Sequence, residues 1–126
     1  MDADSAWILC VADSNTRLNH IARALRRAGY KVSMTSCAHK AVALAAISNH
    51  LQAVVLDEDL IVGEESVAES IKAVKPVPVL LVCDNGPSGA LPSGVDLVTA
   101  NGSRQQVVAG VEKLLKRVRV SAHLAS

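Results

Sequence analysis

The sequence predicts an α/β domain with a parallel β-sheet, because short apolar segments alternate along the chain with segments of helical periodicity. The apolar segments are rich in Val, Leu and Ile, and turn-forming residues separate them from their neighbours. The expected strands cover residues 7–12, 30–35, 53–57, 79–83 and 95–99. Right-handed crossovers then give a flavodoxin-like, doubly wound sheet of five strands in the order 2-1-3-4-5.

The expected helices are recognised by apolar residues spaced three or four apart and by capping residues at their ends. Asn15 or Thr16 is expected to cap the first helix, and Gly29 is well placed to end it. The other expected helices cover residues 38–49, 64–74 and, from about Ser103, the stretch to residue 118. Residues 84–94 contain three Gly and two Pro, so the fourth helix of this alternating order is expected to be shortened or absent.

Length and composition predict one domain with an aliphatic core. The chain has 126 residues, half of them apolar, and its only aromatic residues are Trp7 and Tyr30. The core is therefore expected to consist of Val, Leu, Ile and Ala, within about residues 6–118 of a single domain over residues 1–126. Residues 1–5 and 121–126 are expected to be loose tails.

Charge and cysteine usage exclude several classes of protein. The net charge is +1, so no overall field attracts nucleic acid or a membrane surface. No apolar run approaches the roughly 18 residues of a membrane span. Cys10, Cys37 and Cys83 are odd in number and scattered, which indicates reduced thiols in a cytoplasmic protein.

Basic residues gather in the first expected helix. Arg17, Arg23, Arg26 and Arg27 are interpreted as a solvated helix face. A nucleic-acid site would also need exposed aromatic residues or an added reader motif, and neither is present. No nucleic-acid partner is therefore expected.

Two apolar strand segments end in a carboxylate. Asp13 follows the first expected strand, and Asp57 closes the third. These two strands are neighbours in the expected sheet, and ligands bind in the crevice at the carboxyl ends of such strands. Because carboxylate oxygens are ligands that Mg²⁺ prefers, the pair predicts a site suited to this ion.

These features together resemble the receiver domain of two-component response regulators. The resemblance covers roughly residues 6–118 and includes the length, the element order and the spacing of the two aspartates. The segments that carry it are residues 8–13, 54–57, 79–83 and 94–96.

The resemblance implies a bacterial signalling domain of the phosphorelay type that is not itself an enzyme. It receives a phosphoryl group from a histidine kinase or a phosphotransfer protein. Asp57 is then the phosphoacceptor, and Mg²⁺ is held by Asp13, Asp57 and a backbone oxygen of Asp59. The metal matters because a carboxylate attacks phosphorus poorly unless charge is neutralised.

The sequence departs from the family pattern around this site. One acid, Asp13, stands where the family usually has two. Cys83 stands in place of the hydroxyl that binds a phosphoryl oxygen, and a thiol is a weak donor. The family's lysine is missing, and Asn101 or Ala100 occupies its place according to the register. The aromatic residue of the fifth strand is missing as well, since residues 79–126 contain none.

Two hypotheses follow. In the first, the chain is a receiver that accepts phosphate at Asp57 with impaired or atypical activation. In the second, it is a phosphorylation-independent pseudo-receiver that acts as a protein-interaction module. A phosphotransfer or redox enzyme of this fold would need a phosphate-cradling loop after the first strand, and residues 14–16 are a poor one.

Overall fold

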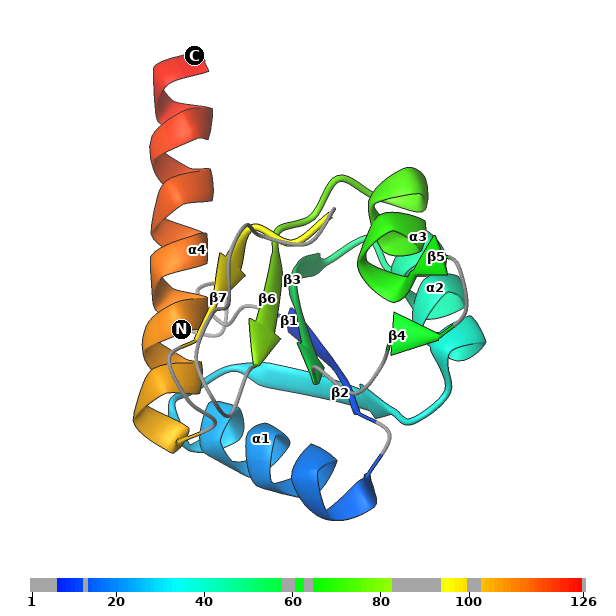
Figure 1. Cartoon of the computed structure of the whole chain (residues 1–126). Coiled ribbons are helices and arrows are strands. Elements are labelled where there is room, and N and C mark those ends of the chain that lie inside the picture. The colour runs from blue at the N-terminus through cyan, green and yellow to red at the C-terminus, as the bar shows by residue number, and fades with distance from the viewer. Residues whose placement is uncertain are drawn as a thin grey trace.

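A parallel sheet lies at the centre of the computed structural model, which describes residues 7–12, 14–57, 61–62, 65–82, 94–99 and 103–125. Its strands are β1 (Trp7–Val11), β2 (Lys31–Thr35), β3 (Leu51–Asp57), β6 (Val79–Val82) and β7 (Leu97–Val98). They lie in the order β2-β1-β3-β6-β7, and every neighbouring pair is parallel (Figure 1). The predicted fold class and strand order are confirmed.

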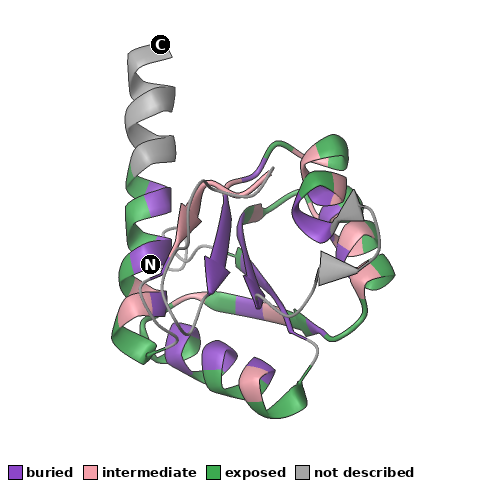
Figure 2. Ribbon diagram, in the orientation of Figure 1, coloured by how far each residue is buried: buried purple, intermediate pink, exposed green. Residues whose placement is uncertain are grey.

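Helices cover both faces of this sheet. On one face α1 (Asn15–Arg27) packs beside α4 (Arg104–Ala125), and on the other α2 (Ala38–Ile47) packs beside α3 (Val67–Val74). Alternate residues of β1 serve the two layers: Ile8 and Cys10 face α1 and α4, while Leu9 and Val11 face α2 and α3. The central strands are accordingly buried, apart from the first residue of β1 and the first two residues of β3 (Figure 2).

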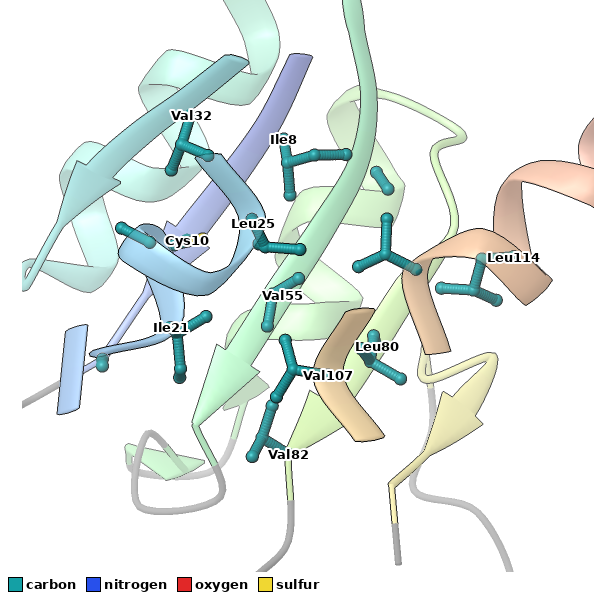
Figure 3. Close-up of a cluster of buried hydrophobic side chains, with 14 of the residues drawn as sticks. Ile8, Cys10, Ile21, Leu25, Val32, Val55, Leu80, Val82, Val107 and Leu114 are labelled. Carbon is teal, nitrogen blue, oxygen red and sulfur yellow. The ribbon is translucent and has the colours of Figure 1, made fainter. Parts of the chain in front are cut away.

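The core between the sheet and α1 and α4 is aliphatic, as predicted. Figure 3 shows Leu25 of α1 and Val107 of α4 beside Val55 of β3, and all three are fully buried. Burying a side chain of this size stabilises the fold by about 1.5–3 kcal/mol. This packing, together with the buried Leu18 and Ile21 nearer its amino end, holds α1 against the sheet.

The first turn of α1 begins one residue earlier than predicted. The N-cap is Ser14, whose Oγ accepts a hydrogen bond from the Arg17 backbone N–H at 3.4 Å, rather than Asn15 or Thr16. The helix ends as predicted at Gly29, which has a positive φ of 101°. As a result, Arg17 lies in the first turn of α1.

The segment before α3 differs from the prediction. The strands β4 (Ile61–Val62) and β5 (Glu65–Ser66) form a small antiparallel pair, so the helix begins at Val67 instead of residue 64. Val67 and Ile71 are buried, whereas Val74 is 45% exposed. The last residue of α3 is therefore in contact with solvent.

The turn before β7 is hydrogen-bonded to β6 and ion-paired with α3. The Asp96 carboxylate accepts a hydrogen bond from the Val79 backbone N–H at 2.8 Å and pairs with the Lys72 ammonium at 2.6 Å. Gly94 has a positive φ of 84° and lies against the backbone of α3. These contacts fix the position of β7, which is only two residues long.

The prediction of a loose tail after residue 120 is wrong for residues 121–125, because α4 continues to Ala125 and projects beyond the sheet (Figure 1). No Gly or Pro follows Gly110, so nothing in the backbone ends the helix earlier. The predictions for residues 1–5 and for the fourth helix fall outside the described residues. Among the residues that are described, no helix is long and apolar enough to cross a membrane.

Candidate functional site

Asp57 is the last residue of β3, the middle strand of the sheet. It is paired in register with Val82, the last residue of β6, and its neighbour Leu56 is paired with Val11, the last residue of β1. Three strands therefore end together around this carboxylate. This places Asp57 at the edge of the sheet where the sequence predicted a ligand site.

The Asp57 carboxylate is buried and ion-paired. Its side chain is only 1% exposed, and its Oδ2 accepts a hydrogen bond from Nε of Arg17 at 2.5 Å. The Arg17 side chain is 32% exposed, so it reaches from the buried carboxylate to the surface. A buried carboxylate requires such a partner, because removing an unpaired charge from water is very costly.

The start of α1 explains how the local sequence brings this cation to Asp57. Ser14 caps the helix just beyond the end of β1, and Leu18 is buried beneath α1. Arg17, between them, therefore lies beside the sheet edge. A positive charge in the first helical turn is opposed by the helix dipole, and no acidic residue of that turn offsets it. The Asp57 carboxylate provides the compensating charge.

The interpretation of Arg17 as part of a solvated helix face is wrong. Arg23 and Arg27 are exposed as expected, and Arg26 donates a hydrogen bond from Nη2 to the backbone oxygen of Val32 at 3.3 Å. One signal in the sequence could have identified Arg17. The lysine expected after the fifth strand was missing, and Arg17 was the first cation after the end of the first strand.

Asp57 is the predicted site residue whose surroundings the structure describes. Asp13, Asp59, Cys83 and Asn101, together with Ala100, lie outside the described residues, so the roles assigned to them stay predictions. Within the described part of the chain, no group of three or more His, Cys, Asp or Glu side chains could hold a metal ion.

Arg17 repels a second cation from the Asp57 carboxylate. A metal ion on Oδ2 would have to share that oxygen with the Arg17 guanidinium, which already donates to it at 2.5 Å. Like charges at such distances repel strongly, above all where water is excluded. The described arrangement therefore does not fit a Mg²⁺ ion bound to this oxygen while Arg17 holds it.

Thr99 is a buried polar residue that the sequence analysis did not select. It follows β7 directly, its side chain is 3% exposed, and its backbone N–H donates to the Leu81 carbonyl oxygen at 3.0 Å. Two strand spacings separate β7 from β3, which amounts to about 9–10 Å. Thr99 therefore lies at the same edge of the sheet as Asp57, two strands away from it.

The thiol of Cys10 plays no part in chemistry at this edge. It is buried inside β1, and burial raises its pKa from 9.0 to about 12, while the nearby charge of Arg26 lowers the pKa in part. The thiolate, which is the reactive form, is therefore scarce at neutral pH. Cys37, by contrast, is exposed.

No protein-family model matches the sequence, and no curated protein matches it. Solved structures do share its fold. The N-terminal domain of a response regulator/sensory box/GGDEF 3-domain protein from Carboxydothermus hydrogenoformans has a TM-score of 0.74 at 21% identity, over 93% of this chain and 99% of that one. A CheY-like response regulator receiver domain protein from Methanospirillum hungatei has a TM-score of 0.76 at 15% identity, over 94% and 99%.

The same fold also occurs in a protein that is not named as a response regulator. A putative pilus assembly-related protein from Burkholderia pseudomallei has a TM-score of 0.71 at 20% identity, over 88% of this chain and 90% of that one. Similarity at these levels of identity establishes the fold alone. The resemblance to receiver domains is thus confirmed as a shared fold.

Proposed function

We propose that this chain is a cytoplasmic, receiver-type signalling domain in which Asp57 accepts a phosphoryl group. The observation behind this proposal is the place of Asp57, whose carboxylate ends the middle strand of a receiver fold and is paired with a cation. The domain acts as an acceptor rather than as an enzyme, and its donor is a histidine kinase or a phosphotransfer protein.

The transfer has a simple balance of bonds. An oxygen of the ionised Asp57 attacks the phosphorus atom of the donor, and the bond from phosphorus to the leaving group breaks. The leaving group departs with the electron pair. Positive charge beside the acceptor favours this step, since both the carboxylate and the phosphoryl group are negative. Arg17 supplies one such charge at 2.5 Å from Oδ2.

Activation is proposed to be atypical because the strand that usually relays it is altered. In β7, Leu97 and Val98 are half-buried aliphatic residues, and each packs against one of the two cores. Neither can act as an aromatic switch. The predicted replacements at Cys83 and Asn101 point the same way, because neither provides the hydroxyl or the ammonium group of the family.

A second function is favoured by the same ion pair. Asp57 is 1% exposed and its charge is already compensated by Arg17, so the site is stable as it stands. A pseudo-receiver that binds a partner without phosphorylation needs no more than this.

Intact mass separates the two functions. The folded protein is incubated with acetyl phosphate beside Asp57→Asn and Glu112→Gln, a control that removes one carboxylate from an exposed site on α4. The proposal predicts one added phosphoryl group on the wild type and on Glu112→Gln, and none on Asp57→Asn. If folded wild type gains no phosphoryl group under any condition, the interaction module becomes the better description.

A further inference from the structure

We propose that Arg17 is the resident cation of the Asp57 site and takes the place of a divalent metal ion. Two consequences follow. The unmodified site does not bind Mg²⁺ at millimolar concentrations, and Asp57 is phosphorylated at a rate that does not depend on Mg²⁺. The second consequence rests on the function proposed above, whereas the first does not.

The Asp57 carboxylate is already bound by Arg17. Its Nε donates to Oδ2 of Asp57 at 2.5 Å, and the exposure of the two side chains is 32% and 1%. Solvent therefore reaches the Arg17 side chain more easily than it reaches the carboxylate. An ion that binds Oδ2 has to come close to the positive charge of Arg17, which already donates to that oxygen.

Charge then excludes the metal. Mg²⁺ binds carboxylate oxygens at about 2 Å and gives up its water reluctantly. A Mg²⁺ ion on Oδ2 would come within about 4–5 Å of the guanidinium, where repulsion between a divalent and a monovalent cation is twice that of two monovalent ones. Arg17 cannot relieve this repulsion by losing a proton, because a guanidinium stays charged at every accessible pH.

The same side chain suits the phosphorylated state. Its hydrogen bond to Oδ2 uses Nε, and the two terminal nitrogens of the fork carry further donors. Arginine is well suited to bind phosphoryl oxygens through two such donors at once. Arg17 can thus neutralise the carboxylate before transfer and hold the phosphoryl oxygens afterwards, two tasks that a metal ion and a lysine share in the resembled family.

The first test is a Mg²⁺ titration of unmodified protein, by calorimetry and by the amide shifts of β3 and α1. Wild type and Arg27→Gln, a control from the exposed side of the same helix, are expected to show no saturable binding at millimolar Mg²⁺. Arg17→Lys keeps the charge and is expected to behave likewise. Arg17→Gln removes the competing positive charge from the carboxylate, so the affinity of the site for Mg²⁺ is expected to rise by about tenfold or more.

Saturable millimolar binding by wild type with the affinity of Arg17→Gln would overturn the proposal. The wild-type and Arg17→Lys titrations decide this point even if Arg17→Gln folds poorly. If wild-type protein binds Mg²⁺ tightly, Arg17 does not exclude the ion, and this conclusion needs no comparison with Arg17→Gln.

The second test follows phosphorylation by acetyl phosphate in Mg²⁺ and in excess chelator. Asp57 forms the new bond to phosphorus while acetate leaves with the electron pair, so no metal enters the balance. The wild-type rate is expected to change by less than about twofold, and the Arg17→Gln rate to become Mg²⁺-dependent by about tenfold. A tenfold lower phosphorylation rate of wild type in chelator overturns this inference and leaves the proposed function standing. Absence of any phosphoryl adduct overturns the proposed function, and the titration still decides the role of Arg17.

Discussion

Removal of Arg17 from its ion pair with Asp57 is expected to destabilise the fold more than removal of both partners. In Arg17→Gln the carboxylate, 1% exposed, keeps its charge and loses its guanidinium. Breaking a fully buried pair in this way costs about 3–5 kcal/mol. Because Arg17 is 32% exposed, water screens part of the interaction, and we reduce the expected loss to about 2–3 kcal/mol.

The other two variants complete a thermodynamic cycle. Asp57→Asn removes the buried charge and keeps an oxygen that can accept from Arg17, so a loss of about 1 kcal/mol is expected. The double variant places two neutral amides together and leaves no buried charge. Its loss is expected to be smaller than the sum of the two single losses by about 2 kcal/mol.

Urea unfolding followed by helical circular dichroism measures these differences. With a slope of roughly 1.5 kcal/mol per M, the midpoint of Arg17→Gln should fall by about 1–2 M, and that of the control Arg27→Gln by less than about 0.3 M. The reasoning is refuted if Arg17→Gln is no less stable than Arg27→Gln. It is also refuted if the losses at Arg17 and Asp57 add to within about 0.5 kcal/mol.

Three further outcomes are expected. In folded protein at neutral pH, a thiol reagent should label the exposed Cys37 and leave the buried Cys10 unlabelled. Peptide mass spectrometry measures the labelling of each cysteine. Labelling of Cys10 in protein that stays folded would contradict its burial. The pKa of Cys10 is raised from 9.0 to about 12, mainly by burial and despite Arg26, so its contribution to stability is complete below pH 9 and is lost between these values. The loss is about 1.4 kcal/mol per pH unit in urea titrations, and a Cys10→Ala variant with the same slope would exclude this cause. Gly94→Ala places a Cβ 2.8 Å from the backbone of α3 at a φ of +84°, so it should lower the free energy of unfolding by about 3 kcal/mol. Gly29→Ala has nothing within 4 Å of the new Cβ at a φ of +101°, so its loss should be about 1–2 kcal/mol. Equal shifts of the two melting temperatures would refute this difference.

The elements that the sequence predicted correctly are those with a strong local pattern. The buried run of β3 and the amphipathic face of α1 each repeat an apolar signal over several residues. The elements it missed have none. The strands β4 and β5 are two residues long, too short for any period, and residues 121–125 continue α4 without a repeated apolar face to indicate it.

The candidate site divides in the same way. Asp57 was recognisable because an apolar strand ends in a carboxylate, and the structure places it where the pattern predicted. Arg17 was not recognised, since it is one of four arginines in α1 and its partner lies on a strand far along the chain. Its pairing with Asp57 depends on its place in the first turn of α1, next to the end of β1.

By itself the sequence determined the α/β class, the strand order and the position of Asp57 at the carboxyl edge of the sheet, because alternation of apolar segments is written in neighbouring residues. The tertiary structure alone decided which cation serves that carboxylate. Arg17 and Asp57 are 40 residues apart in the chain. Their contact depends on the cap at Ser14 and on how the buried face of α1 packs against β3. No local pattern encodes such a distance, since it follows from the packing of the whole layer.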